Sequence, residues 1–69
     1  MISYKPFYKL LKERKISTYE LVHKYKISSN LLHRLRNNMN ITTKQIDKLC
    51  ELFDCDISDI MCREKTFYN

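Results

Sequence analysis

Residues 18–37, which read TYELVHKYKISSNLLHRLRN, decide the fold. Apolar residues in this stretch fall into two groups with helical spacing, separated by a short polar connection. Counted from Thr18, the places expected to face a core are the fourth, fifth, eighth, tenth, fifteenth and eighteenth, and all six hold apolar residues: Leu21, Val22, Tyr25, Ile27, Leu32 and Leu35. The pattern predicts two short helices, each of which buries one face.

Residues that favour helix ends flank both groups. Ser17 followed by Glu20 has the spacing of a capping box, and the sequence predicts a helix over about 18–25. Ser28 is a good N-cap for a second helix over 29–36. Asn37-Asn38 would end that helix, since asparagine tolerates the left-handed conformation. Two helices joined by so few residues form a helix-turn-helix, here over 18–37.

Helical spacing continues on both sides of this unit. We expect a helix at about 4–15, with Ser3 as its N-cap and Pro6 in its first turn. A fourth helix should begin after Thr42 or Thr43, and a last short helix or turn is expected at 57–61. No strand is predicted, and residues 63–69 are expected to be a frayed tail. The sequence therefore predicts one all-α domain over 1–69, a compact bundle of about five short helices.

Charge is unevenly divided along the 69 residues. The first 44 residues hold ten basic and two acidic side chains, a net charge of +8, whereas the last 25 have a net charge of −3. A basic part joined to an acidic part suits a protein with one face for a polyanion. Charge alone leaves a generally solvated basic surface as an equal alternative.

Several functional classes are disfavoured. The three cysteines have no CxxC spacing and form no zinc pattern with His23 and His33, so we expect reduced thiols and no metal or cofactor. No glycine is present for a phosphate-binding loop, and no Ser–His–Asp or His–Cys set occurs, so an enzyme is not expected. No apolar run approaches the roughly 20 residues of a membrane span, which predicts a soluble, cytoplasmic protein.

The order of these features resembles a Cro/CI-type (lambda-repressor-like) helix-turn-helix domain of bacteria and phages. Thr18, Ile27-Ser28, Leu32 and Leu35 carry the resemblance, together with a later stretch that contains LCELFDCDISDIM at 49–61. The similarity covers about residues 3–62. Two positions depart from the family pattern, because Lys26 replaces a glycine of the turn and Val22 replaces a small residue. Lysine at positive φ costs roughly 1 kcal/mol, and Val22 is expected to push the two helices slightly apart.

The resemblance implies that the helix at 29–36 enters the major groove of DNA. The base contacts it implies are Ser29, Asn30, His33 and Arg34. Asn30 would pair with adenine and Arg34 with guanine, while His33 serves as a base or phosphate contact. The phosphate contacts it implies are Thr18, Lys26, Arg36, Asn37 and Lys44. The alternative for Asn30 and Arg34 is that both are merely solvated residues.

The resulting hypothesis is a sequence-specific regulator that binds double-stranded DNA, represses phage or bacterial genes and acts in the bacterial cytoplasm. We expect a homodimer that spans two half-sites about 34 Å apart. Its contact surface is expected within 57–61 and after Cys62, where Phe67 and Tyr68 stand. The alternative is a protein-interaction module of the same fold, an antirepressor or adaptor that binds another regulator. The basic residues around one helix favour DNA.

Overall fold

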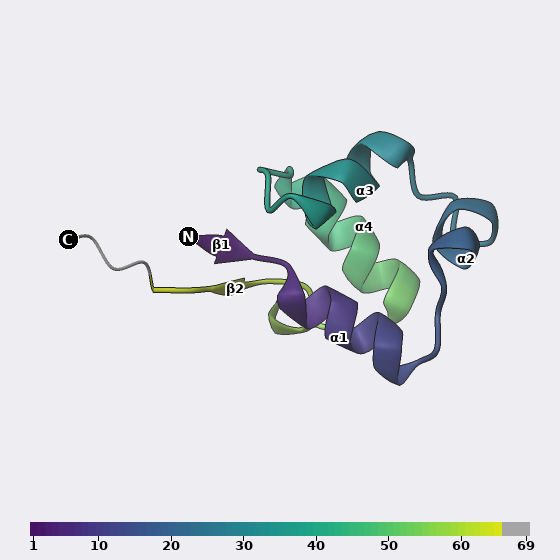
Figure 1. The fold of residues 1–69 in the computed structure, drawn as a ribbon, viewed down its shortest axis with the longest axis horizontal. Coiled ribbons are helices and arrows are strands. Elements are labelled where there is room, and N and C mark those ends of the chain that lie inside the picture. The colour runs from purple at the N-terminus through teal and green to yellow at the C-terminus, as the bar shows by residue number, and fades with distance from the viewer. Residues whose placement is uncertain (66–69) are drawn as a thin grey trace.

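Four α-helices, one 3-10 helix and a two-stranded sheet make up residues 1–65, the part of the chain that the computed structural model describes (Figure 1). The elements in chain order are β1 (Ile2–Ser3), α1 (Lys5–Glu13), α2 (Thr18–His23), α3 (Ser29–Arg36), α4 (Thr43–Phe53), η1 (Ile57–Asp59) and β2 (Cys62–Arg63). The expected bundle of short helices is confirmed. The small sheet corrects the all-α class, and the last of the five helices is a single 3-10 turn.

The side-chain caps lie where the sequence predicts them. Ser17 Oγ accepts from the Glu20 amide at 3.2 Å, and the Glu20 carboxylate accepts from the Ser17 amide at 3.3 Å. Ser28 Oγ accepts from the Leu31 amide at 3.1 Å, which starts α3 at the expected residue. Thr42 starts α4 with a second capping box. Each cap satisfies an amide that the first helical turn leaves without a backbone partner.

The first helix is shorter than the predicted 4–15. Its N-cap is Tyr4, so the expected cap at Ser3 is wrong, although Ser3 Oγ accepts from the Lys5 amide at 3.2 Å. At the other end Lys15 takes a φ of 55°, and the Ile16 amide donates to the Leu11 carbonyl. Such a left-handed residue with a back-reaching amide ends a helix. The second helix likewise ends at His23, two residues before the predicted end.

One apolar core lies among the four α-helices. Phe7 and Phe53 meet edge to face with ring centroids 5.5 Å apart, and Tyr25 covers Phe53 at 4.7 Å. The buried apolar residues are Tyr4, Phe7, Leu11, Leu21, Ile27, Leu31, Leu32, Leu35, Leu49, Phe53 and Ile60. Four of the six apolar places of the helix-turn-helix are among them, and Tyr25 is half-buried.

Val22 is the exception. Val22 is 39% exposed, so the expectation that it is buried is wrong, while its expected effect on the spacing of the two helices stays a prediction. On a six-residue helix, Leu21 alone is enough to face the core, where it is 1% exposed. Val22 is its neighbour in sequence and points to a different side, since adjacent residues are about 100° apart around a helix.

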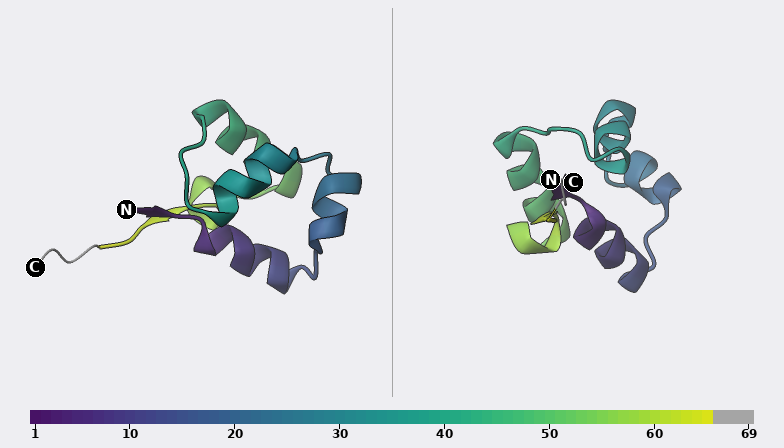
Figure 2. Two further views of the ribbon diagram at one scale, coloured as in Figure 1. Left: turned by 45° about the horizontal axis from the view of Figure 1, so that its top comes forward. Right: turned by 60° about the vertical axis from the view of Figure 1, so that its left-hand side comes forward.

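A short sheet joins the two ends of the described chain, where no strand was predicted. Ile2 pairs with Arg63 and Ser3 with Cys62 in antiparallel register. Figures 1 and 2 show β1 and β2 side by side at the end of the molecule opposite α2. Arg63 therefore lies in a strand rather than in the expected frayed tail, while residues 66–69 of that tail lie outside the described residues. Two-residue strands are too short to show a sequence period.

Two side chains hold α1 against the rest of the fold. The Tyr4 hydroxyl donates to the Met39 carbonyl at 2.7 Å, and the Tyr4 amide donates to Asn38 Oδ1 at 3.1 Å. At the other end of α1, the Arg14 guanidinium donates to the Phe53 carbonyl. The segment that follows α3 is thus fixed to α1, which holds the C-terminal end of α3 in place.

Lys26 takes a φ of 58° in the connection between α2 and α3, as the glycine of the family pattern implies. Lys26→Gly is expected to raise the free energy of unfolding by about 0.5–1 kcal/mol, because glycine has no Cβ to clash in this conformation. Lys24→Gly is the matched control, since Lys24 is also exposed but has a φ of −88°. The control should destabilise the domain. Urea unfolding would contradict this account of the turn if both variants lost stability.

Candidate nucleic-acid interface

The third helix divides into a buried and an outer face. Leu31, Leu32 and Leu35 are 1–7% exposed and fix α3 on the core. The four residues expected to contact bases all lie outside this set: Ser29, Asn30 and His33 are exposed, and Arg34 is half-buried. Their position follows from helical spacing, because the polar residues fall between the leucines. The structure thus presents all four from one helix.

Asn30, Arg34 and the Asn40 carbonyl form a connected set. Arg34 Nε donates to Asn30 Oδ1 at 3.0 Å, one helical turn away. Arg34 Nη1 donates to the Asn40 carbonyl at 3.1 Å, which joins α3 to the segment that leads into α4. The guanidinium is therefore held at two points. A shallow hollow adjoins it, lined by Ser28, Asn30, Arg34, Asn40, Ile41, Thr42 and Gln45.

His33 and Asn37 form a second pair along α3. Asn37 Nδ2 donates to the His33 carbonyl at 2.8 Å and lies 3.3 Å from His33 Nδ1. The side chain of Asn37 thus caps the C-terminal end of the helix. A phosphate contact by this amide, as expected from the sequence, would use the second N–H of Nδ2 and would compete only with His33 Nδ1 for it.

The remaining residues expected to contact phosphate lie at the two ends of α3. Thr18 begins α2 and Lys26 lies in the connection before α3, whereas Arg36 ends α3 and Lys44 is the second residue of α4. All four are exposed. In Figure 1, α2 lies near the N-terminal end of α3, while Figure 2 shows the start of α4 set apart from the C-terminal end of α3 by the connecting segment. Thr18 and Lys26 therefore lie toward one end of α3, Arg36 lies at its other end, and Lys44 lies beyond the connecting segment.

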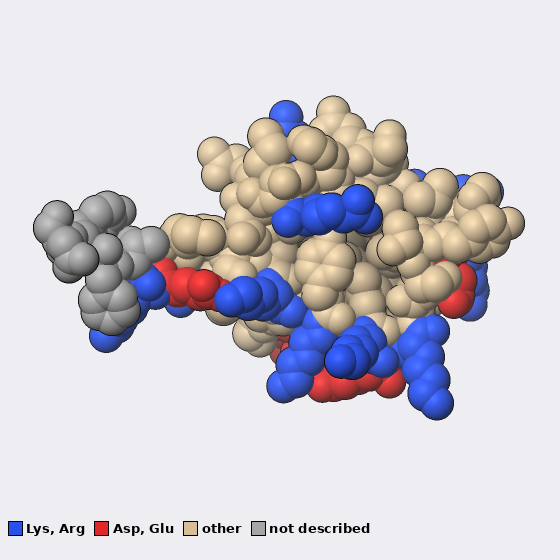
Figure 3. All heavy atoms as spheres, in the orientation of Figure 1, with Lys and Arg blue, Asp and Glu red and all other residues tan. Residues whose placement is uncertain are grey.

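Basic charge is less concentrated around the outer face of α3 than the net charge of +8 on the first 44 residues suggests. The helix-turn-helix residues 18–37 carry four basic and one acidic side chain, a net charge of +3. The segment 5–15 carries five basic and one acidic side chain, a net charge of +4. Figure 3 shows Lys and Arg gathered over α1, with acidic groups beside them, and few charges over α3. Five of the ten basic residues among the first 44 residues are thus on α1 and in the turn after it.

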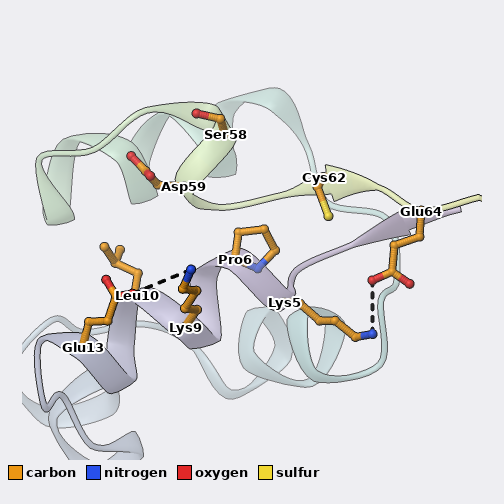
Figure 4. A pocket seen from close by; sticks show the side chains of 9 residues that line it. All are labelled: Lys5, Pro6, Lys9, Leu10, Glu13, Ser58, Asp59, Cys62 and Glu64. Carbon is orange, nitrogen blue, oxygen red and sulfur yellow. Dashed lines mark ion pairs between the residues drawn. The ribbon is translucent and has the colours of Figure 1, made fainter.

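A hollow of about 470 Å³ lies between α1, η1 and β2 (Figure 4). Its cations are paired, since Lys5 Nζ lies 3.2 Å from Glu64 and Lys9 Nζ lies 4.0 Å from Glu13. Hydrogen bonds from Lys5 and Ser3 lower the pKa of the Glu64 carboxyl. With its charges balanced in this way, the hollow is a poor site for a polyanion.

The three cysteines are free thiols. Cys50, expected in the core, is half-buried and packs against it, as does Cys55, while Cys62 is exposed. Burial, together with the neighbouring Cys50 and Asp59, raises the pKa of the Cys55 thiol to about 11, so it stays protonated near neutral pH. Within residues 1–65, no three His, Cys, Asp or Glu side chains are grouped to hold a metal ion. None of the helices described there is long and apolar enough to span a bilayer.

Sequence reasoning missed Asn40. Its role lies in a backbone carbonyl, which every residue has, so its side chain gave no signal. The conformation that brings it to Arg34 comes from Asn38, which has a φ of 54° and lets the Met39 amide donate to the Arg34 carbonyl at 2.8 Å. The left-handed asparagine was expected, but the contact it permits was not.

The family model of the Cro/C1-type helix-turn-helix DNA-binding domain matches residues 8–65. The chain belongs to this family. Among solved structures, the chain is similar to the transcriptional regulator VanUg, with a TM-score of 0.77 and 30% identity over 87% of this chain and 80% of that one. A comparison with curated proteins gives no significant match. The resemblance of this Cro/C1-type domain to its family is thus confirmed, and that family is one of DNA-binding domains rather than enzymes.

Proposed function

We propose that this Cro/C1-type domain is a sequence-specific transcription regulator, a repressor, that reads the major groove of double-stranded DNA with α3. The observation that carries the proposal is the outer face of α3, where Ser29, Asn30, His33 and Arg34 are presented by a helix fixed through three buried leucines. A helix fits the major groove, where each base pair shows a distinct pattern of donors and acceptors.

Phosphate contacts complete the proposal. Lys26, Arg36 and Lys44 flank α3 and would each neutralise a phosphate, while Thr18 places a hydroxyl and the start of α2 toward the backbone. These contacts fix the orientation of the domain but carry no sequence information. The similar regulator VanUg supports a role in transcription for a chain of this fold.

A homodimer is part of the proposal, because a single helix reaches only a few base pairs and paired domains can read two half-sites. Within the segment expected to form the dimer surface, Ile57 is 60% exposed, Met61 is half-buried and Ile60 is fully buried, so Ile57 offers the most exposed apolar side chain for contact. Phe67 and Tyr68, the other residues expected there, lie outside the described residues.

Selection from a random duplex library, followed by a salt titration on the enriched duplex, tests the function. We expect one enriched motif and an affinity that falls steeply with salt, since each neutralised phosphate contributes a slope of about −0.9 in log K against log salt. Sedimentation with the same duplex gives the number of protein chains bound. Absence of a motif together with a flat salt dependence would instead indicate a domain that binds another regulator.

A further inference from the structure

Resting on the proposed function, we infer that Asn30 and Arg34 act as one base-reading unit that selects guanine, with Asn30 as the positioning residue for Arg34. The sequence suggests two separate readers, Asn30 for adenine and Arg34 for guanine. The hydrogen bonds between them point to a different arrangement, in which both side chains address the same base pair.

The first step is the identity of the atoms that meet. Arginine carries five N–H donors and no acceptor, so the amide atom that faces Arg34 Nε at 3.0 Å must be the oxygen of Asn30. This contact occupies one of the two acceptor positions on Asn30 Oδ1. Adenine needs that same oxygen to accept from its N6 amino group when it pairs with asparagine. An adenine at this place would thus have to share Asn30 Oδ1 with Arg34 and would bring its own N–H donor close to a guanidinium.

The second step is the count of donors that remain. Arg34 uses one N–H on Asn30 and one on the Asn40 carbonyl, which leaves three of its five, and Asn30 keeps both N–H groups of Nδ2. The unit therefore presents chiefly donors on the outer face of α3. Guanine offers two acceptors, O6 and N7, in the major groove and is the base that matches such a surface.

The third step is preorganisation. A guanidinium tied to Asn30 and to the Asn40 carbonyl has lost part of its rotational freedom before any base arrives, and Arg34 is already half-buried. Less entropy is then lost on binding, and the direction of the remaining donors is fixed. Asn30 acts on the base mainly through Arg34, so its removal should affect the position that Arg34 reads.

The test compares Asn30→Ala, Asn30→Asp, Arg34→Ala and the double alanine variant on the duplex selected by the unaltered protein. Each base pair of the motif is varied in turn, and affinities are measured by fluorescence anisotropy. The unaltered protein should prefer guanine at one position by about tenfold or more. Asn30→Ala should weaken that preference several-fold at the same position, and the double variant should be no less selective than Arg34→Ala.

Asn30→Asp separates the two roles of Asn30. Aspartate keeps an acceptor for Arg34 but has no N–H to donate, so a positioning role predicts that the guanine preference survives while overall affinity falls through repulsion from phosphate. Glu51→Gln, on the exposed surface of α4 and outside the proposed DNA and dimer contacts, is the control and should leave the motif unchanged.

Two results would overturn the inference and differ from a failure of the proposed function. If Asn30→Ala relaxes an adenine position and leaves the guanine preference intact, the two side chains are independent readers. If Arg34→Ala lowers the affinity for every duplex equally, Arg34 is a phosphate contact. In both cases the domain still binds DNA, and only the joint reading of guanine by Asn30 and Arg34 is disproved. If the unaltered protein enriches no motif, the proposed function fails and the unit fails with it.

Discussion

Phe53→Ala is expected to lower the free energy of unfolding by about 3–5 kcal/mol, the usual cost of removing a buried phenyl ring. The Phe53 side chain is 2% exposed and packs on Phe7 and Tyr25, so its loss leaves a cavity where α1, α4 and the end of α2 meet. A domain of this length has a total stability of roughly 3–10 kcal/mol. The variant should therefore be largely unfolded, or unfold at low urea.

Urea denaturation followed by circular dichroism at 222 nm measures this effect. Tyr19→Ala is the aromatic control, since Tyr19 is 71% exposed and stacks only on His23 among the aromatic contacts of residues 1–65, and we expect a change below about 1 kcal/mol. Phe53→Leu, which keeps most of the volume, should cost about 1–1.5 kcal/mol and still fold. A loss below 1 kcal/mol for Phe53→Ala would show that this ring does not centre the core.

Replacing Arg36 and Lys44 together by alanine is expected to weaken DNA binding roughly 50–100-fold near 0.1 M salt and to reduce the salt slope by about two. Both side chains are exposed, Arg36 at the end of α3 and Lys44 in the first turn of α4. The loss should be nearly the same for every duplex, because phosphate contacts do not distinguish bases.

Lys9 and Lys12 supply a control with the same change in net charge. Both are exposed on α1, outside the helix-turn-helix. The Lys9→Ala/Lys12→Ala variant should keep most of the affinity and the full salt slope. If it weakens binding as much as the Arg36/Lys44 variant does, the basic charge acts over the whole molecule and α3 has no privileged phosphate contacts.

Local signals in the sequence were enough to predict where three of the helices begin. Ser17 with Glu20, Ser28 and Thr42 each fix a helix start by bonding to amides three residues away, so these boundaries follow from neighbouring residues alone. Four of the six apolar places expected in the helix-turn-helix core are buried, because helical periodicity determines which side of a helix faces inward.

Long-range contacts were not predictable in this way. The pairing of Ile2 with Arg63 joins residues far apart in the sequence, and two-residue strands have no period to detect. The contact of Arg34 with the Asn40 carbonyl depends on the backbone conformation between them. At the candidate site, the residues on the outer face were predictable from spacing, but the hydrogen bonds that tie them together were not.

Within residues 1–65 of this glycine-free sequence, four connections use left-handed residues, at Lys15, Lys26, Asn38 and Asp54. A glycine at each would relax the native backbone but would also widen the range of shapes open to the unfolded chain. Non-glycine residues at these positions therefore strain the native backbone, but they also reduce the conformational entropy that the chain loses on folding compared with glycine. The result is four separate places where a single substitution can tune its melting temperature without touching the core, and three of them, Lys15, Asn38 and Asp54, lie outside the residues proposed to meet DNA.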